Sequence, residues 1–151
     1  MPMSLENDIA QSEFRNEYHK ALINLLYTNN FVVDNMNRAF KDYDITRQQY
    51  NVLRILRGKA PEPVTINHIK ERMIDRMSDA SRIVERLRLK GLIERKQNID
   101  DRRAVEVYIT QEGLSLLDKL AAVAEGFENF FSPLSSEEAA TLNALLDKVR
   151  C

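Results

Sequence analysis

The segment Ser78–Thr110, SDASRIVERLRLKGLIERKQNIDDRRAVEVYIT, decides the fold of this chain. Its first half carries apolar residues at helical spacing, and two strand-like pieces follow, separated by the arginine-rich turn NIDDRR. A helix followed by a basic two-stranded ribbon can place one element in the major groove of DNA and the other in the adjacent minor groove. The segment therefore predicts a sequence-specific DNA-binding protein.

The helix of this segment is expected to begin at Ser78, or as early as Asp75, with the Ser78 hydroxyl accepting from the backbone N–H of Ser81. Gly91 would end it, with Leu92 folded back on the last turn. The strands are predicted at residues 93–97 and 104–109. The face of the helix that should pack inward carries Ala80, Ile83, Val84 and Leu87.

Outward from this segment, the apolar spacing predicts helices on both sides. One covers residues 14–29, and the apolar stretch FVVDNMNRAF continues or restarts it until Asp44–Ile45. Thr46 and Gln49 form a capping-box pattern that opens another helix, and Ser135 and Glu138 repeat it near the end of the chain. A short extended piece at residues 64–66, a short helix after it, and a helix from residue 110 to Pro133 complete the pattern.

The predicted fold is mainly α with a small β-wing: a winged helix-turn-helix flanked by N- and C-terminal dimerisation helices. Residues 1–45 and 111–151 would supply the dimerisation helices, and residues 46–110 the DNA-binding lobe. The terminal helices are too apolar to stand alone, so we expect them to pack together and against a second copy, forming a homodimer.

Charge is distributed unevenly along the 151 residues. Residues 54–103 hold 14 Lys and Arg against 8 Asp and Glu, whereas the whole chain has a net charge of −1. A basic middle between acidic ends suggests that only the middle meets a polyanion, although a charged solvated face would look the same. No apolar run approaches a membrane span of roughly 20 residues, and no signal peptide is recognisable, so a cytoplasmic protein is expected.

Three motifs carry a resemblance to the MarR family of bacterial transcription regulators over essentially the whole chain. They are RLRLKGL at Arg86–Leu92, DRR at Asp101–Arg103 and TQEG at Thr110–Gly113. The resemblance implies a homodimer with two winged lobes on double-stranded DNA, and repression is the family's commoner outcome. Two recognition helices about one DNA turn apart, roughly 34 Å, would require a pseudo-palindromic operator.

Candidate DNA contacts fall at the start of the helix and on the wing. Arg82 could bind guanine, Asp79 could accept from cytosine or merely cap the helix, and Arg102 suits a narrow minor groove. Asp101 is expected to brace Arg102 or Arg103 through charge-assisted hydrogen bonds rather than touch DNA, because DNA would repel its carboxylate. The full set on the helix side is Arg76, Ser78, Asp79, Ser81 and Arg82, and on the wing Arg95, Lys96, Asp101, Arg102 and Arg103.

The resemblance also implies a small organic effector that binds where the dimer helices meet the winged lobe. Candidate lining residues, each of which could equally be plain core, are Tyr27, Phe31, Met36, Phe40, Tyr43 and Tyr50. No cofactor is expected, and no metal, because His19 and His68 lack partners at ligand spacing. Cys151 has no neighbour that would activate a thiolate, so no redox role is assigned to it.

Two other functional classes are compatible with parts of the sequence. The chain could be a winged-helix module that binds a protein, or a constitutive DNA binder without a ligand; the arginine-tipped wing favours DNA over protein. An enzyme is disfavoured, since the sequence has no glycine-rich phosphate loop, no nucleophile motif and no paired His and carboxylate constellation. The sequence leaves the operator, the regulated genes and the choice between repression and activation open.

Overall fold

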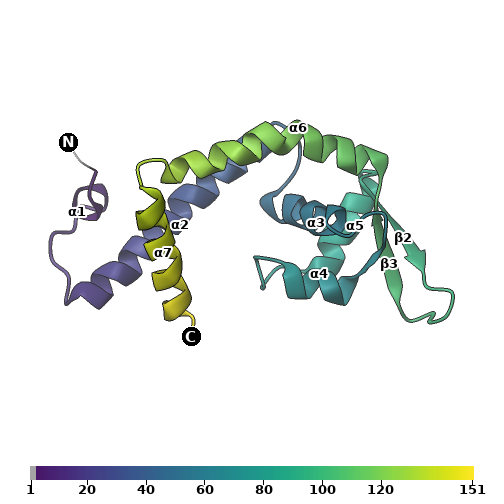
Figure 1. Ribbon diagram of the computed structural model, residues 1–151, viewed down its shortest axis with the longest axis horizontal. Helices are drawn as coiled ribbons and strands as arrows, with labels where there is room; N and C mark the ends of the chain where they lie inside the picture. The colour runs from purple at the N-terminus through teal and green to yellow at the C-terminus, as the bar shows by residue number, and fades with distance from the viewer. Residues whose placement is uncertain (1–2) are drawn as a thin grey trace. The chain divides into compact units, whose positions relative to one another are not determined.

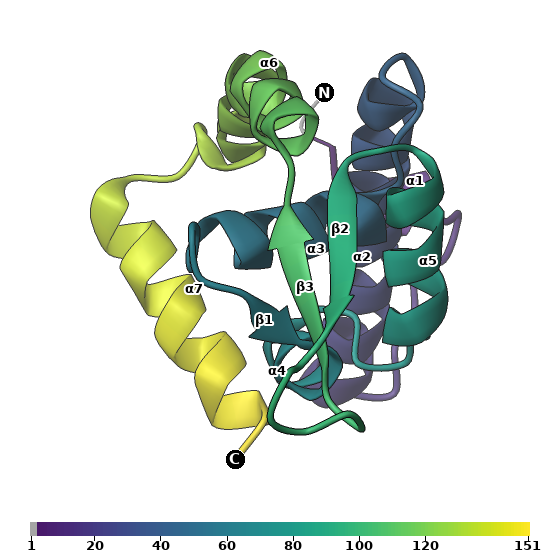
Figure 2. The same ribbon diagram turned by 90° about the vertical axis from the view of Figure 1, so that its right-hand side faces the viewer.

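The computed structural model describes residues 3–151 and divides into two compact units, residues 1–39 and residues 40–151. The second unit contains the winged lobe together with the C-terminal helices (Figures 1 and 2). The elements are α1 Leu5–Asp8, α2 Glu17–Lys41, α3 Arg47–Arg57, β1 Val64–Thr65, α4 Ile66–Arg72, α5 Ala80–Leu89, β2 Ile93–Gln97, β3 Val105–Ile109, α6 Gln111–Glu128, the 3-10 turn η1 Asn129–Phe131 and α7 Ser136–Val149.

Capping residues set the starts of most helices, as the sequence indicated. Both predicted capping boxes are present: Thr46 Oγ1 accepts from Gln49 N, and Ser135 does the same for Glu138 at the start of α7. Thr110 opens α6 by accepting from Gly113 N. Each cap satisfies backbone N–H groups that have no partner inside the helix, and is worth about 1 kcal/mol.

Two predicted boundaries of the N- and C-terminal helices need correction, and one short helix was not predicted. The helix expected from Phe14 begins at Glu17, because the Asn16 side chain caps it: Asn16 Oδ1 accepts from His19 N. It then runs unbroken to Lys41, so the second apolar stretch continues it. The short α1 was not predicted, and α6 ends at Glu128, followed by η1, rather than reaching Pro133.

A three-stranded antiparallel sheet with the order β1-β3-β2 forms the wing and its base (Figure 2). Val64 pairs with Val107 on one side of β3, and Arg95 pairs with Val107 on the other. Val107 is the fully buried residue of β3, whose other residues are half-buried, and Ile93 is the buried residue of β2. The outer part of β2 has solvent on both faces, so the ribbon extends away from the core as a wing.

The core of the lobe is made by α3, α4, α5 and α6 packed around the base of the sheet. Its fully buried side chains include Val52, Leu53, Leu56, Ile69, Val84, Leu87, Val107 and Leu120. The end of α5 is locked by two hydrogen bonds, Leu92 N to Leu87 O and Gly91 N to Arg88 O, with Gly91 at φ +73°. This is the predicted Schellman stop, which needs a residue tolerant of the left-handed region. It turns the chain directly from α5 into β2.

Apolar side chains remain exposed on helices of both units. On α2 they are Tyr18, Leu22, Leu25, Leu26, Tyr27 and Phe31. On α7, which buries no residue, they are Leu145 and Val149. None of the helices among residues 3–151 combines the length and apolar character needed to cross a lipid bilayer.

Candidate nucleic-acid interface

The start of α5 is capped by Asp79, not by Ser78 as the sequence suggested. Asp79 Oδ1 accepts from Arg82 N at 3.1 Å, and α5 begins at Ala80. The Ser78 side chain instead hydrogen-bonds to Asp75, which is the main reason why the pKa of the Asp75 carboxyl lies below its ordinary value. Both side chains can cap a helix, and the competing bond to Asp75 decides between them. The consequence is that Ser81 and Arg82 lie in the first turn of α5 with exposed side chains.

The turn between α4 and α5, residues 73–79, is held by side chains of α3. Asn51 Oδ1 accepts from Ile74 N at 2.9 Å, and Gln48 Nε2 donates to Asp75 Oδ2 at 3.3 Å. Asp75 Oδ1 in turn accepts from Met77 N at 3.2 Å. These bonds fix the angle at which α5 leaves the lobe. They set the position of Arg76, which is exposed beside them.

A carboxylate on α5 joins the helix to the wing. Glu85 accepts from Arg88 at 2.7 and 3.0 Å, and from Arg95 Nη1 of β2 at 2.9 Å. The hydrogen bonds from Arg88 and then Arg95 lower the pKa of Glu85 to about 2. Arg95, one of the candidate DNA contacts on the wing, is therefore tied back to α5.

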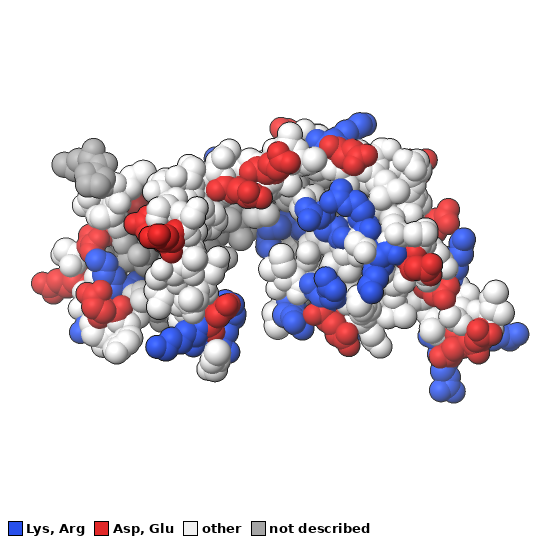
Figure 3. All heavy atoms as spheres, viewed as in Figure 1, with Lys and Arg blue, Asp and Glu red and all other residues white. Residues whose placement is uncertain are grey.

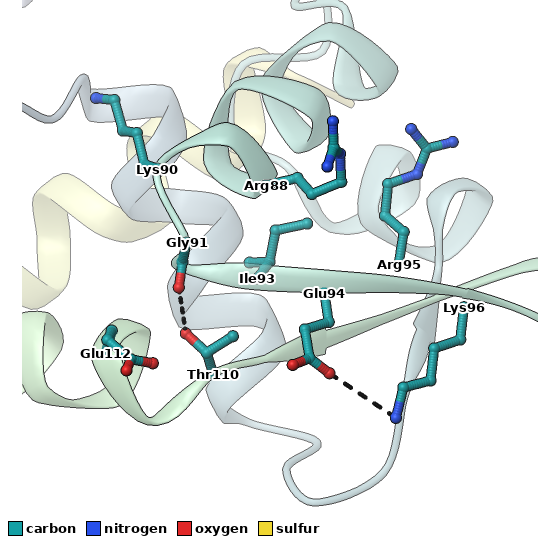
Figure 4. Close-up of a pocket in the computed structure, with 9 residues that line it drawn as sticks. All are labelled: Arg88, Lys90, Gly91, Ile93, Glu94, Arg95, Lys96, Thr110 and Glu112. Atoms are coloured by element: carbon teal, nitrogen blue, oxygen red, sulfur yellow. Dashed lines mark hydrogen bonds and ion pairs between the residues drawn. The ribbon is translucent and has the colours of Figure 1, made fainter.

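The base of the wing borders an open hollow of about 670 Å³ (Figure 4). In this view the side chains of Arg88, Ile93 and Arg95 lie on one side of strand β2. Those of Glu94 and Lys96 lie on the other side and form an ion pair of 3.8 Å. Lys96 also lies 4.9 Å from the centroid of the Tyr108 ring. Lys96 is thus held along the strand by a carboxylate and an aromatic face.

The tip of the wing is a rigid turn built by its own polar side chains. Asn98 Oδ1 accepts from the backbone N–H groups of Asp100 and Asp101 at 2.8 and 3.0 Å. Gln97 Nε2 donates to Arg102 O at 2.7 Å. The turn therefore presents the exposed side chain of Arg102 from a fixed backbone.

Asp101 braces the wing turn, but through the backbone and not through the guanidinium group of Arg102 or Arg103 that was predicted. Its Oδ1 accepts from Arg103 N at 3.0 Å, and its carbonyl accepts from Ala104 N at 3.0 Å. The carboxylate of Asp101 thus holds the backbone N–H group of Arg103 and not an arginine guanidinium group. The side chains of Arg102 and Arg103 are both exposed, so both guanidinium groups are open to solvent at the tip.

Basic side chains gather over the part of the lobe where Figure 1 places α3, α4 and α5, whereas acidic and basic groups alternate at the wing (Figure 3). This matches the charge distribution along the sequence, in which residues 54–103 carry the excess of Lys and Arg. A surface of this kind attracts a polyanion and steers its approach.

The six aromatic and methionine candidates for an effector site fall into separate environments. Phe40 is fully buried, with its ring centroid 4.8 Å from Tyr50 and 5.3 Å from Phe127. Tyr50 also accepts a hydrogen bond from Arg54, so this pair forms part of the lobe's core. Tyr43 lies partly exposed in the same unit, and Met36 is half-buried on α2.

Tyr27 and Phe31 lie together in the first unit, along a hollow of about 430 Å³ between α1 and α2. The hollow also takes in Lys20 and Glu6, which form an ion pair. Sequence periodicity could not indicate this hollow, because one wall comes from the unpredicted α1.

Glu85, Gln48, Asn51 and Asn98 were not singled out from the sequence. Glu85 meets Arg95 across 10 residues, and Gln48 meets Asp75 across 27, so local spacing carries no signal for these pairs. Asn98 is the exception. The side chain of an Asn in a turn often accepts from the backbone N–H two residues on, and Asn98 opens the turn NIDDRR.

Comparisons with known proteins agree with this geometry. The model of the MarR family matches residues 43–104. The chain is 30% identical to the HTH-type transcriptional repressor IacR of Pseudomonas putida, over 95% of this chain and 84% of IacR. It is also 30% identical to the regulator PecS of Dickeya dadantii, over 76% of this chain and 70% of PecS.

Among solved structures, a mutant of MarR from E. coli complexed with operator DNA superposes with a TM-score of 0.76 at 27% identity, covering 91% of this chain and 99% of that one. Fold, motifs and relatives therefore converge, and the predicted resemblance is confirmed. This chain belongs to the MarR family of helix-turn-helix transcription regulators.

Proposed function

We propose that this protein is a homodimeric repressor that binds a pseudo-palindromic operator, with α5 in the major groove and the wing in the flanking minor groove. The observation that carries the proposal is the combination of a braced, arginine-flanked start of α5 with a rigid wing tip that exposes Arg102. Phosphate contacts from Arg76 and Arg103 position the protein, and Ser81, Arg82 and Arg102 read the grooves. DNA as the partner places the protein in the cytoplasm.

The homodimer is supported by the apolar side chains that α2 and α7 leave exposed. Exposed apolar patches on a water-soluble lobe mark interaction surfaces. A second copy is the partner that the proposed operator requires, because two-fold protein symmetry matches two half-sites.

The proposal is tested by selecting duplexes from a random-sequence pool and titrating the selected duplex by fluorescence anisotropy at several salt concentrations. Enrichment of one inverted repeat, bound at least about 10³-fold more tightly than random DNA and with a steep salt slope, is expected. Equal affinity for all duplexes would reject an operator-binding regulator. It would favour a winged lobe that binds a protein.

A small organic effector is a second element of the proposal, favoured by the hollow between α1 and α2. Its volume lies within the range of ligand sites, and Tyr27, Phe31 and Lys20 would supply aromatic faces and a cation for an aromatic carboxylate. Binding would favour a dimer geometry that no longer fits the operator. A panel of aromatic carboxylates, screened for release of the selected duplex by the wild type and by Tyr27→Ala, tests this. Equal affinity of a ligand for free and DNA-bound protein would exclude it as an effector.

A further inference from the structure

Two large apolar side chains are left in solvent on the turn that leads into α5. Met77 is 94% exposed and Ile74 is 81% exposed, while Met73 beside them is buried in the core. A single exposed apolar residue is common on a protein surface. These two lie in a segment whose backbone the lobe holds tightly.

The backbone around Met77 is fixed from both sides. Ile74 N donates to Asn51 of α3, Met77 N donates to the Asp75 carboxylate, and Ser78 N donates to Asp75 O at 3.3 Å. The Asp75 carboxylate is itself held by Gln48 of α3. The lobe therefore uses side chains of a second helix to hold residue 77 in place, yet leaves its side chain without packing. That arrangement suits contact with a partner.

The surroundings of Met77 identify the chemistry of that partner. Arg76 precedes it, and Arg82 follows one turn into α5, so a polyanion is attracted to this position. The N-terminal end of a recognition helix is the part that approaches base edges. Among the four bases, thymine alone presents an apolar group in the major groove, its C5-methyl.

We propose that Met77 is a specificity-determining residue that packs against the C5-methyl group of a thymine in each operator half-site. This inference rests on the proposed function. The unbranched thioether side chain can follow the methyl group as the groove deforms. Ile74 lies at the α4 end of the turn, further from α5, and is not assigned this contact.

The test compares two versions of the duplex selected by the wild type, one with thymine and one with uracil at every thymine position. They differ only by C5-methyl groups. For the wild type, the uracil duplex should bind about fourfold more weakly for each half-site, the factor that corresponds to burying one methyl group. In Met77→Ala this ratio should fall by the same factor, while Met77→Leu keeps it.

The matched control is Leu89→Ala, which removes an apolar side chain that is 71% exposed at the opposite end of α5. It should leave the thymine-to-uracil ratio at the wild-type value. A ratio in Met77→Ala equal to that of the wild type, or no ratio in the wild type, overturns the inference while operator binding stands. A pool that yields no preferred duplex overturns the proposed function, and this contact with it. Since Met77 is exposed, its variants should fold, which circular dichroism can verify.

Discussion

At the scale of single residues, Gly113 is a position where α6 passes close to the rest of the lobe. A Cβ there would lie 2.4 Å from Leu92 O and 2.7 Å from Ile109 Cγ1. The carbonyl belongs to the backbone at the turn from α5 into β2, so it cannot move aside without shifting that turn. Gly113→Ala is therefore expected to lower the free energy of unfolding by about 1–3 kcal/mol, measured by urea denaturation.

Gly126 in the same helix is the matched control, because nothing lies within 4 Å of a Cβ added there. Gly126→Ala should raise the free energy of unfolding by about 0.5–1 kcal/mol, since alanine loses less backbone freedom in a helix. If both substitutions shift the free energy of unfolding in the same direction, the close approach of α6 at residue 113 is not the reason why a glycine occupies that position.

Arg82 and Arg102 are expected to contribute to binding in distinguishable ways. Arg82→Ala should cost about 1–3 kcal/mol in operator binding and relax the preference at one base pair of each half-site. Arg102→Ala should abolish a preference for A·T-rich flanks, whose narrow minor grooves attract guanidinium groups. Anisotropy titrations with A-tract and G·C-rich flanks separate the two. Loss of the flank preference in Arg82→Ala instead would reverse the assignment.

At the same scale, the role of a side chain was easier to predict from the sequence than the group with which it forms its hydrogen bond. It predicted a cap near the start of α5 and a bracing role for Asp101, and both are present. It placed the cap at Ser78, because the competing bond from Ser78 to Asp75 depends on how the turn folds. Side-chain choices of this kind follow from three-dimensional proximity, which local spacing does not encode.

At the scale of elements, Asp79 links the integrity of α5 to its role in recognition. Asp79→Ala removes the cap and should lower the free energy of unfolding by about 1 kcal/mol. Asp79→Asn should keep the stability, because Asn caps equally well. If Asp79 also reads a cytosine, Asp79→Asn alters the preference at one base pair in a duplex selection while the urea midpoint stays unchanged. An equal loss of stability in both variants would contradict the capping role.

The ion pairs of Glu85 connect α5 with β2 and have a defined pH dependence. Since hydrogen bonds from Arg88 and Arg95 lower the pKa of Glu85 to about 2, from an ordinary value of 4.5, its contribution to stability is present above pH 4.5 and is lost as the pH falls towards 2. Glu85→Gln should therefore be less stable than the wild type at pH 7, and the difference should shrink below pH 4.5.

Urea titrations of both proteins between about pH 2 and pH 8 measure this difference across the window in which a carboxyl group of this kind titrates. The effect should be small, because the three side chains are partly exposed and solvent screens them. The control is Glu94→Gln, which removes only the 3.8 Å pair with Lys96. A stability difference for Glu85→Gln that stays constant across this range would show that the carboxylate charge is not what joins the two elements.

Sequence periodicity predicted most elements, because each of them carries its apolar residues at a regular spacing. The exceptions have physical causes. The helix α1 has only four residues and one buried side chain, Leu5, which is too little for a periodic signal. For α2, apolar spacing alone left open whether the stretch FVVDNMNRAF continues the helix or starts a new one.

At the scale of the whole molecule, the exposed apolar face of α2 should determine the oligomeric state. Leu22→Glu introduces a charge into that face and should convert a dimer into a monomer in sedimentation-velocity experiments. The monomer should keep weak binding to a half-site and lose tight binding to the full inverted repeat, because the two lobes are no longer linked. Asn24→Glu is the control, since its exposed side chain points about 200° around the helix from that of Leu22. A dimer that survives Leu22→Glu would place the interface elsewhere.

The uneven charge along the chain was visible from the sequence, as was the family. The proposed assembly of two chains was predictable only as a requirement of the apolar helices. Its geometry would depend on how the exposed apolar side chains of α2 and α7 meet a second copy, and composition does not encode that geometry.

Cys151 is the chain's single cysteine, and it lies exposed after α7. For spectroscopy, it gives a ready attachment point: a nitroxide or fluorophore on this thiol reports from one place in each chain. Two copies would then give one label-to-label distance distribution, undisturbed by labels elsewhere. The same labelled sample, read with and without operator DNA, would follow how far the C-terminal helices of two chains move apart, and no native residue would have to be replaced first.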